Sequence, residues 1–237
     1  MFGTRTVVGT SGSKSRFAPG MPVIDRAPAE VPWWAGARLI TLCLVGRPVS
    51  LKYCLASFLL GRTRKPHIPR TAGYHEDRYF HGGPADGEPY PVVDLPYAAA
   101  PARIGLPTCW DQWFPEVARA YSVNGAEVIA YPTAIGSEPD HPDFDTEPLW
   151  RQVIVANGIA NGTFMVVANR WGDEGSITFY GSSFVSDPYG RVPATAPRHE
   201  DAVLVAPLDL DQRRDWLTLF PFLDTRRPDT YGVLTRR

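Results

Sequence analysis

Apolar segments alternate with polar turns along the second half of the chain, and their spacing predicts both strands and helices. Short apolar runs predict strands over 90–95, 104–108, 128–131, 164–168, 178–185 and 202–208. Helical spacing and stop signals predict helices over 115–124, 149–162 and 211–219. A turn at Asp187-Pro188-Tyr189-Gly190 indicates a hairpin after 178–185. Strands that alternate with helices are typical of the α/β class.

The N-terminal part of the chain has a different pattern. Residues 1–36 are rich in Gly, Ser, Thr, Pro and Arg without periodicity, which predicts a loose or disordered tail. Two apolar pieces follow at 39–45 and 53–60, and the turn Gly46-Arg47-Pro48 between them predicts a two-stranded hairpin. We therefore expect one folded domain over 37–237.

Composition excludes several classes of partner. A formal net charge of −1 offers no polybasic surface for nucleic acid or a membrane surface. The apolar stretch at 38–60 is interrupted by Arg47, Pro48 and Lys52, so it is shorter than the ~20 residues of a membrane span, and it starts too late for a signal peptide. The 3 cysteines have neither disulfide nor zinc spacing, which indicates a reducing cytoplasm. The 5 histidines show no ligand spacing, so we expect neither a metal nor another cofactor.

Cys109 stands at the end of a predicted strand, directly before an aromatic-rich helix start. The dipole at a helix N-terminus favours the thiolate form of such a cysteine. A buried cysteine that fills a gap in the core would have the same local pattern. The local sequence leaves both interpretations open.

The residues around Cys109 distinguish a reactive cysteine from one that only fills the core. The string Cys109-Trp110-Asp111-Gln112-Trp113-Phe114-Pro115-Glu116 resembles the nucleophile motif of the nitrilase superfamily of carbon–nitrogen hydrolases, closest to the branch of N-carbamoylputrescine amidases and β-ureidopropionases. Five further strings resemble family motifs in the family's order: Arg64-Lys65-Pro66-His67-Ile68-Pro69, Tyr74-His75-Glu76-Asp77-Arg78-Tyr79-Phe80, Tyr131-Pro132-Thr133-Ala134-Ile135-Gly136-Ser137-Glu138-Pro139, the pair Ala168-Asn169-Arg170 and Phe179-Tyr180-Gly181-Ser182-Ser183-Phe184, and Arg226-Arg227-Pro228-Asp229-Thr230-Tyr231-Gly232. The resemblance begins at about Gly61.

The resemblance implies a metal-free α/β/β/α sandwich that forms homo-oligomers and hydrolyses small amides through a cysteine acyl-enzyme. Such chemistry needs a nucleophile, a proton shuttle and a positive centre for the oxyanion. By resemblance Cys109 is the nucleophile, Lys65 the positive centre, and Glu76 the auxiliary carboxylate that orients the lysine and assists proton transfer. The backbone N–H of Trp110 would be a second oxyanion donor.

Other residues of these motifs have structural interpretations. We expect His67 to be a hydrogen-bonded loop histidine and Asp111 to cap the helix. Glu116 and Arg119 are expected to form structural ion pairs or hydrogen bonds. Asn157 stands where many relatives carry histidine.

One family feature is not recognisable. The family's general base is a glutamate in a Leu-Pro-Glu string that precedes the lysine motif. Only Glu30 precedes Lys65, and no apolar strand leads to it, so we do not assign it as the base. The family's opening strand and first long helix are unrecognisable as well. In addition, Pro107 falls in a predicted strand, where it would remove a ladder donor.

The substrate and the activity remain open on sequence alone. By resemblance, the Cys-Trp-Asp-Gln string favours an N-carbamoyl amine or amide over a nitrile, because true nitrilases tend to have Cys-Trp-Glu at this place. An acidic loop that holds Glu138, Asp140, Asp143, Asp145 and Glu147 either favours a cationic substrate, such as a carbamoylated polyamine, or is a solvated loop. Without a recognisable base, the alternative is a catalytically impaired remnant that acts only as an interaction subunit.

Overall fold

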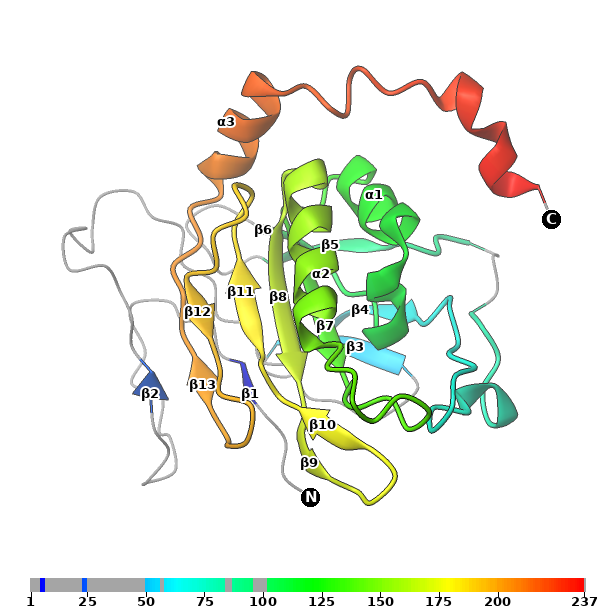
Figure 1. The fold of residues 1–237 in the computed structure, drawn as a ribbon. Coiled ribbons are helices and arrows are strands. Elements are labelled where there is room, and N and C mark those ends of the chain that lie inside the picture. Colours follow the sequence, from blue (N-terminus) through cyan, green and yellow to red (C-terminus); the bar gives the residue numbers. More distant parts are fainter. Residues whose placement is uncertain are drawn as a thin grey trace.

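A mixed six-stranded sheet forms the centre of the computed structural model, which describes residues 5–6, 23–24, 50–55, 58–83, 87–95 and 102–236. The strand order is β12-β11-β8-β7-β6-β5. The strands span β5 Val92–Leu95, β6 Ala102–Gly105, β7 Val128–Thr133, β8 Phe164–Asn169, β11 Phe184–Ser186 and β12 Ala194–Thr195. The central strands β6, β7 and β8 are parallel, and the outer pairs are antiparallel (Figure 1). The predicted α/β class is confirmed.

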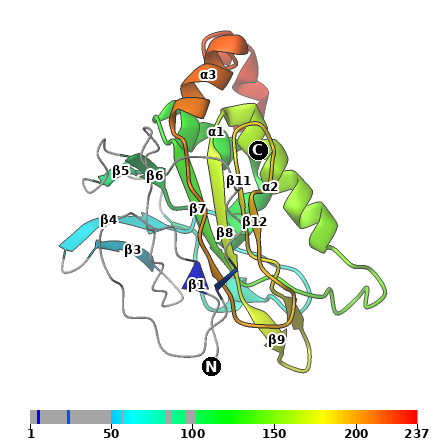
Figure 2. The ribbon, with the colours of Figure 1, turned by 90° about the vertical axis from the view of Figure 1, so that its left-hand side faces the viewer.

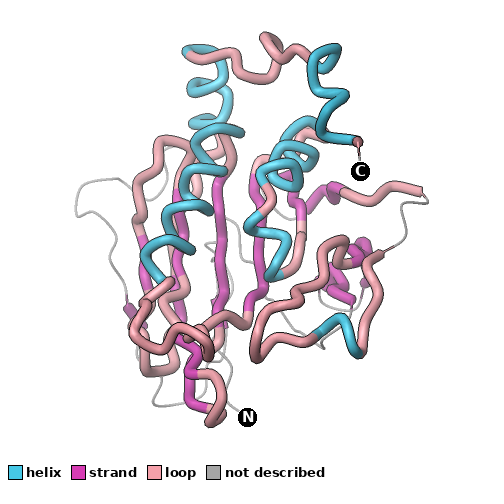
Figure 3. Tube along the Cα trace, turned by 45° about the vertical axis from the view of Figure 1, so that its right-hand side comes forward, coloured by secondary structure: helices cyan, strands magenta, loops and turns pink. Residues whose placement is uncertain are grey.

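Two helices connect the parallel strands and cover one face of the sheet. α1 (Pro115–Val123) joins β6 to β7, and α2 (Glu147–Asn161) joins β7 to β8. Figure 3 shows both helices in front of the strands. α2 ends at Gly162, whose left-handed backbone (φ 61°) closes the helix without the steric cost of a side chain.

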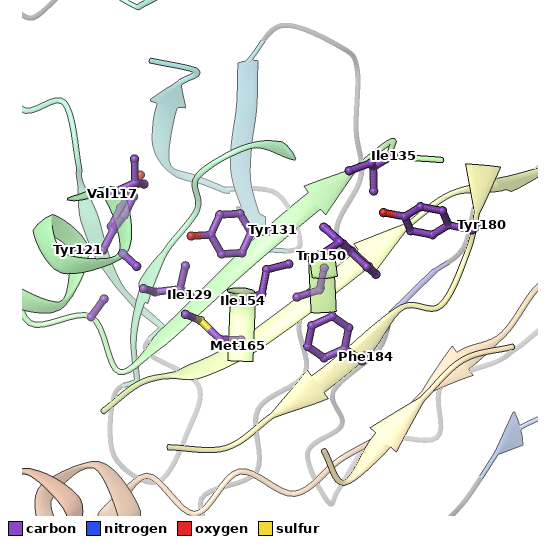
Figure 4. Packing of buried hydrophobic residues seen from close by; sticks show 13 residues of the cluster. Val117, Tyr121, Ile129, Tyr131, Ile135, Trp150, Ile154, Met165, Tyr180 and Phe184 are labelled. Carbon is purple, nitrogen blue, oxygen red and sulfur yellow. The ribbon is translucent and has the colours of Figure 1, made fainter. Parts of the chain in front are cut away.

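Both faces of the central strands are buried, because successive side chains point to opposite sides. On β7, Ile129 packs under the helices and Val128 faces the other side; on β8, Met165 and Val166 divide in the same way. The cluster under the helices is labelled in Figure 4: Val117, Tyr121, Ile129, Tyr131, Ile135, Trp150, Ile154, Met165, Tyr180 and Phe184. This two-sided burial makes the central strands a rigid platform.

Further strands lie on the second face. β13 (Val203–Leu204) pairs in parallel with β1 (Arg5–Thr6) and β2 (Val23–Ile24). β3 (Ser50–Leu55) and β4 (Phe58–Arg64) form an antiparallel hairpin. In Figure 2 this hairpin and α2 lie on opposite sides of β7 and β8. Helices, sheet and additional strands therefore follow the layer order of the expected sandwich.

Several predicted boundaries are wrong. The predicted strand over 104–108 ends at Gly105, so Pro107 follows β6 and removes no ladder donor. The predicted strand over 178–185 is two strands in different sheets, because Gly181 and Ser182 both have left-handed backbones that break the extended chain. Its first part, β10 (Thr178–Tyr180), pairs with β9 (Trp171–Asp173), and the predicted turn joins β11 to β12. An apolar run alone did not reveal this change of direction.

The hairpin prediction was displaced along the chain. The predicted strand over 53–60 spans the end of β3 and the start of β4, because a continuous apolar run does not mark where the chain reverses. The partner predicted at 39–45 and most of the 1–36 tail lie outside the described residues. The late strand over 202–208 is only Val203–Leu204.

The chain ends in a helix and an arm. α3 (Asp211–Leu219) matches its predicted bounds, and the chain then arches over the end of the sheet towards a 3₁₀ helix, η3 (Pro228–Thr235) (Figure 1). No helix in the described ranges has the length and apolar character needed to cross a membrane.

Candidate active site

Three parallel strands end at one edge of the main sheet, and the segments that follow them build the candidate site. The Cys109 turn follows β6, the loop that begins at Ala134 follows β7, and Asn169 ends β8. In open α/β sheets, ligands bind at the carboxyl ends of the strands. This edge is therefore the first place to look for a site.

Cys109 begins a short 3₁₀ helix, η2 (Cys109–Trp113), with a left-handed backbone of φ 45°. A non-glycine residue in this region costs of order 1–3 kcal/mol and persists only where its surroundings hold it. The Cys109 Sγ lies 3.9 Å from the carbonyl oxygen of Ala134. The turn presents the thiol to the loop after β7.

Asp111 ties this turn together. Its side chain is fully buried, and Oδ2 accepts a hydrogen bond from the backbone N–H of Thr108 at 3.0 Å. Oδ1 accepts two bonds from His67, from its backbone N–H at 3.1 Å and from Nδ1 at 2.9 Å. His67 is a hydrogen-bonded loop histidine, as predicted. Asp111 does more than the helix cap we expected, since it also joins the turn to the lysine loop.

Lys65 and Glu76 form a close ion pair. The Lys65 Nζ lies 2.6 Å from Glu76 Oε2, and the two side chains are 13% and 31% exposed. Lys65 directly follows β4, and Glu76 begins the 3₁₀ helix η1 (Glu76–Arg78). Charge-assisted bonds of this length are strong and directional. The structure thus brings together two of the residues that the sequence motifs selected.

A pocket of about 200 Å³ has both Glu76, one member of this pair, and Cys109 in its wall. Its walls are Pro69, Thr71, Tyr74, Glu76, Cys109, Trp110, Trp113, Ala134, Ile135, Glu138, Thr146 and Leu149. Cys109, Glu76 and Trp110 therefore share one concave site, and Lys65, which is not part of the pocket wall, reaches it through its ion pair with Glu76. Mostly apolar walls with a few polar groups are typical of small-molecule sites.

The electrostatics of Cys109 differ from the sequence-based expectation. Burial raises the pKa of the Cys109 thiol, and the nearby Lys65 ammonium opposes this rise. Glu76 and Asp111 add smaller contributions that also raise it. The desolvation cost of a thiolate thus outweighs the opposing attraction of Lys65, and the pKa of the thiol lies above its ordinary value.

The acidic loop contributes one carboxylate to the pocket. Burial raises the pKa of Glu138, which lines the pocket beside Thr146. Asp145 and Glu147 instead contact Arg198, and Glu147 also contacts Arg151. The remaining members, Asp140 and Asp143, are exposed and lie outside the pocket wall. Glu138 is therefore the acidic-loop residue placed to meet a ligand.

Two residues that the sequence did not single out shape the pocket. The Tyr74 hydroxyl accepts the Gly136 N–H at 2.8 Å, and burial raises the pKa of this phenol. The buried Asn169 amide bonds both the N–H and the carbonyl of Ile135, each at 3.0 Å. Both residues hold the loop after β7. The sequence offered one sign of their importance, because both residues lie within the motifs that resemble the family.

The remaining motif residues support the site or lie away from it. Trp110 packs edge to face on Trp113, with ring centroids 6.5 Å apart. Asn157 donates from Nδ2 to the backbone oxygen of Gln112 at 3.3 Å, which ties α2 to η2. Within residues 102–236 no ion pair joins Glu116 to Arg119, and neither lines the pocket. Glu30 lies outside the described residues.

Known proteins are similar to this chain in sequence and fold. The family model described as carbon-nitrogen hydrolase matches residues 40–217. The N-carbamoylputrescine amidase of Solanum lycopersicum is 44% identical over 183 residues, which cover 74% of this chain and 59% of that protein. The citrullinase of Francisella tularensis is 40% identical over 186 residues, which cover 76% and 62%. A crystal structure of a carbon-nitrogen hydrolase from Helicobacter pylori G27 aligns with a TM-score of 0.67 at 34% identity, again covering 76% and 62%. The chain therefore spans about three fifths of the length of these relatives.

Proposed function

The chain belongs to the carbon–nitrogen hydrolase family, and we propose that it hydrolyses a non-peptide C–N bond of an N-carbamoyl amine or amide through a covalent intermediate on Cys109. The observation that carries the proposal is the shared pocket of Cys109 and Glu76, with Lys65 paired to Glu76 at 2.6 Å. The pocket holds a nucleophile and a carboxylate, and a positive charge is paired to that carboxylate; these are the groups that acyl transfer requires.

The residues act in sequence on a carbamoyl carbonyl. The Cys109 sulfur bonds to the carbonyl carbon, and the oxyanion that forms is stabilised by the Lys65 ammonium and the Trp110 N–H. The thiol proton passes by way of the Glu76 carboxylate to the leaving nitrogen, the C–N bond breaks, and the amine departs. Water then attacks the carbon, the C–S bond breaks, and Cys109 regains its proton. The carbamic acid released decomposes to ammonia and carbon dioxide.

The pocket favours a substrate with a cationic tail. Glu138 is partly desolvated in the pocket wall, as its raised pKa reflects, and a substrate ammonium beside it would compensate for this cost. Apolar side chains of Pro69, Trp113 and Leu149 line the same space and suit a methylene chain. A carbamoylated diamine has both features. The name N-carbamoylputrescine amidase, which a 44% identical relative carries, describes such a substrate.

We also propose that the chain works as a homo-oligomer in the cytoplasm. The end of α3 exposes large apolar side chains, with Leu219 66% and Phe220 43% exposed. Exposed apolar patches of this kind often mark association surfaces. Light scattering on the purified chain would show the oligomer, and a monomer at micromolar concentration would contradict it.

The activity is tested with paired substrates. The full chain is incubated with N-carbamoylputrescine, which carries an ammonium, and with N-carbamoyl-β-alanine, which carries a carboxylate. Ammonia and free amine are then measured. We expect release from the first substrate to exceed release from the second, and none from a Cys109→Ala chain. Equal release from wild-type and Cys109→Ala chains would overturn the proposal.

A further inference from the structure

His67 lies outside the pocket wall, yet it connects the two segments that carry the site. It follows Lys65 by two residues, and its hydrogen-bond partner Asp111 follows Cys109 by two residues. The two segments are 44 residues apart in the chain at this contact. The contact therefore joins the lysine loop to the nucleophile turn at a fixed point.

The link between His67 and Asp111 is short, partly buried and made of two hydrogen bonds. Asp111 is fully buried while His67 is 30% exposed, and two hydrogen bonds reach the same carboxylate oxygen. Because a carboxylate only accepts, Nδ1 of the imidazole carries the proton in this bond. The imidazole also stacks on Phe114, with ring centroids 3.7 Å apart and an interplanar angle of 11°. The hydrogen bond to Asp111 in η2 fixes one edge of the imidazole, and the stack on Phe114, directly after η2, fixes its face.

The two linked segments are themselves stiff. Pro66 stands between Lys65 and His67 and fixes one backbone torsion. The Lys65 carbonyl accepts a bond from the Gly83 N–H at 2.9 Å. On the other side, the second oxygen of Asp111 holds the Thr108 N–H directly before the strained Cys109. A displacement of His67 would therefore move Lys65 relative to the thiol.

We propose that His67 is a positioning residue, which acts through Asp111 to hold the Lys65 ammonium at its working distance from the Cys109 sulfur. The proposal rests on Cys109 being the nucleophile of the proposed function. The groups that act electrostatically on the thiol are Lys65, Glu76 and Asp111. Of these, Lys65 is the one that favours the thiolate, so its placement sets how readily Cys109 reacts.

Two substitutions separate the hydrogen bond from the ring stack. His67→Phe keeps the aromatic ring over Phe114 and removes the Nδ1 donor. His67→Asn places an amide donor near the position of Nδ1 and removes the stack. The exposed His199 provides a control, His199→Ala. The measurement is the rate of iodoacetamide addition to the Cys109 peptide against pH, followed by mass spectrometry, which needs no knowledge of the substrate.

We expect His67→Phe to react about tenfold more slowly near neutral pH, as for a thiol pKa raised by about one unit, while His67→Asn and His199→Ala react like the wild type. In a chain that already carries Lys65→Met, His67→Phe should add no further effect, because it acts through the lysine. An unchanged profile in His67→Phe, equal losses in both His67 variants, or additive losses with Lys65→Met would each overturn the proposal.

Hydrogen exchange on the wild-type chain keeps the test decisive if His67→Phe does not fold. The backbone amides of His67 and Thr108 both donate to Asp111, so both should exchange slowly. Fast exchange of the His67 amide would contradict the proposed link between His67 and Asp111. If the wild type hydrolyses no carbamoyl substrate but its thiol still responds to His67, the proposed function fails and the positioning role stands.

Discussion

The Lys65 ammonium lies 2.6 Å from the Glu76 carboxylate, and the same carboxylate lines the pocket that contains Cys109. Lys65 also acts electrostatically on the Cys109 thiol, whose buried surroundings disfavour the thiolate. Lys65 opposes the effect of burial on the Cys109 pKa, and Glu76 holds Lys65 in place. We therefore expect the reactivity of Cys109 to depend on Lys65 and Glu76, which lie earlier in the chain.

Replacement of Cys109 tests the nucleophile. Cys109→Ala should abolish amide hydrolysis and leave the melting temperature close to that of the wild type, because the removed sulfur makes one long contact to Ala134. Cys54→Ala should keep full activity. Activity that survives Cys109→Ala and disappears with Cys54→Ala would show that the nucleophile was assigned wrongly.

Loss of the positive centre should reduce turnover strongly. Lys65→Met removes the charge proposed to stabilise the oxyanion, and kcat/KM should fall by roughly 10²–10³-fold, as for the loss of an oxyanion donor. Arg70→Gln, at an exposed cation of the same loop, is the matched control and should have little effect. Steady-state kinetics that show equal changes in the two variants would mean that Lys65 acts only through general charge.

Glu138 should determine preference for a cationic tail. Glu138→Gln keeps the shape of the side chain and removes its charge, so KM for N-carbamoylputrescine should rise more than KM for an uncharged N-carbamoyl alkylamine. Because burial raises the pKa of Glu138, the neutral amide should also be slightly stabilising near pH 7 without substrate. Asp140→Asn, at an exposed residue of the same loop, is the control; identical KM changes in both variants would contradict the assignment.

The raised pKa of Cys109 has a consequence for pH dependence. The folded chain holds the thiol proton more tightly than the unfolded chain does, so this group stabilises the fold below the unfolded pKa, and that contribution is lost as pH rises through the folded pKa. Stability should therefore fall on the alkaline side, and less so in Cys109→Ala. Urea titrations across the alkaline range, compared between the two chains, measure this difference; a steeper loss in Cys109→Ala would contradict it.

The kinetics of an activated ester should show a burst. Acylation needs only the thiol and its neighbours, whereas deacylation needs a base to activate water, and such help is typically worth about 10²–10⁴-fold. Without the family's Leu-Pro-Glu glutamate, the acyl-enzyme should accumulate to about one equivalent and then hydrolyse slowly.

Stopped-flow measurement of the released alcohol decides between three outcomes for this chain. Sustained fast turnover would contradict the burst and would mean that Glu138, Glu30 or another residue supplies the base. The absence of any burst, with an inert thiol, would support the non-catalytic interaction subunit instead.

The sequence by itself determined the family and the local elements. Helical spacing predicted α3 with its observed bounds, and α2 ends at the expected glycine, because these features depend on neighbouring residues and backbone freedom. The ordered motifs also selected Cys109, Lys65 and Glu76, whose catalytic roles stay predictions.

The tertiary structure decided what depends on which segments meet. The bond between His67 and Asp111 spans 44 residues, so no local pattern contains it. Glu138 differs from the other acids of its loop only because the fold places it in the pocket wall and gives Asp145 and Glu147 an arginine partner. The sequence favoured a readily ionised Cys109, whereas burial among distant segments raises its pKa. Desolvation and pairing are properties of packed surroundings, and only the folded chain creates those surroundings.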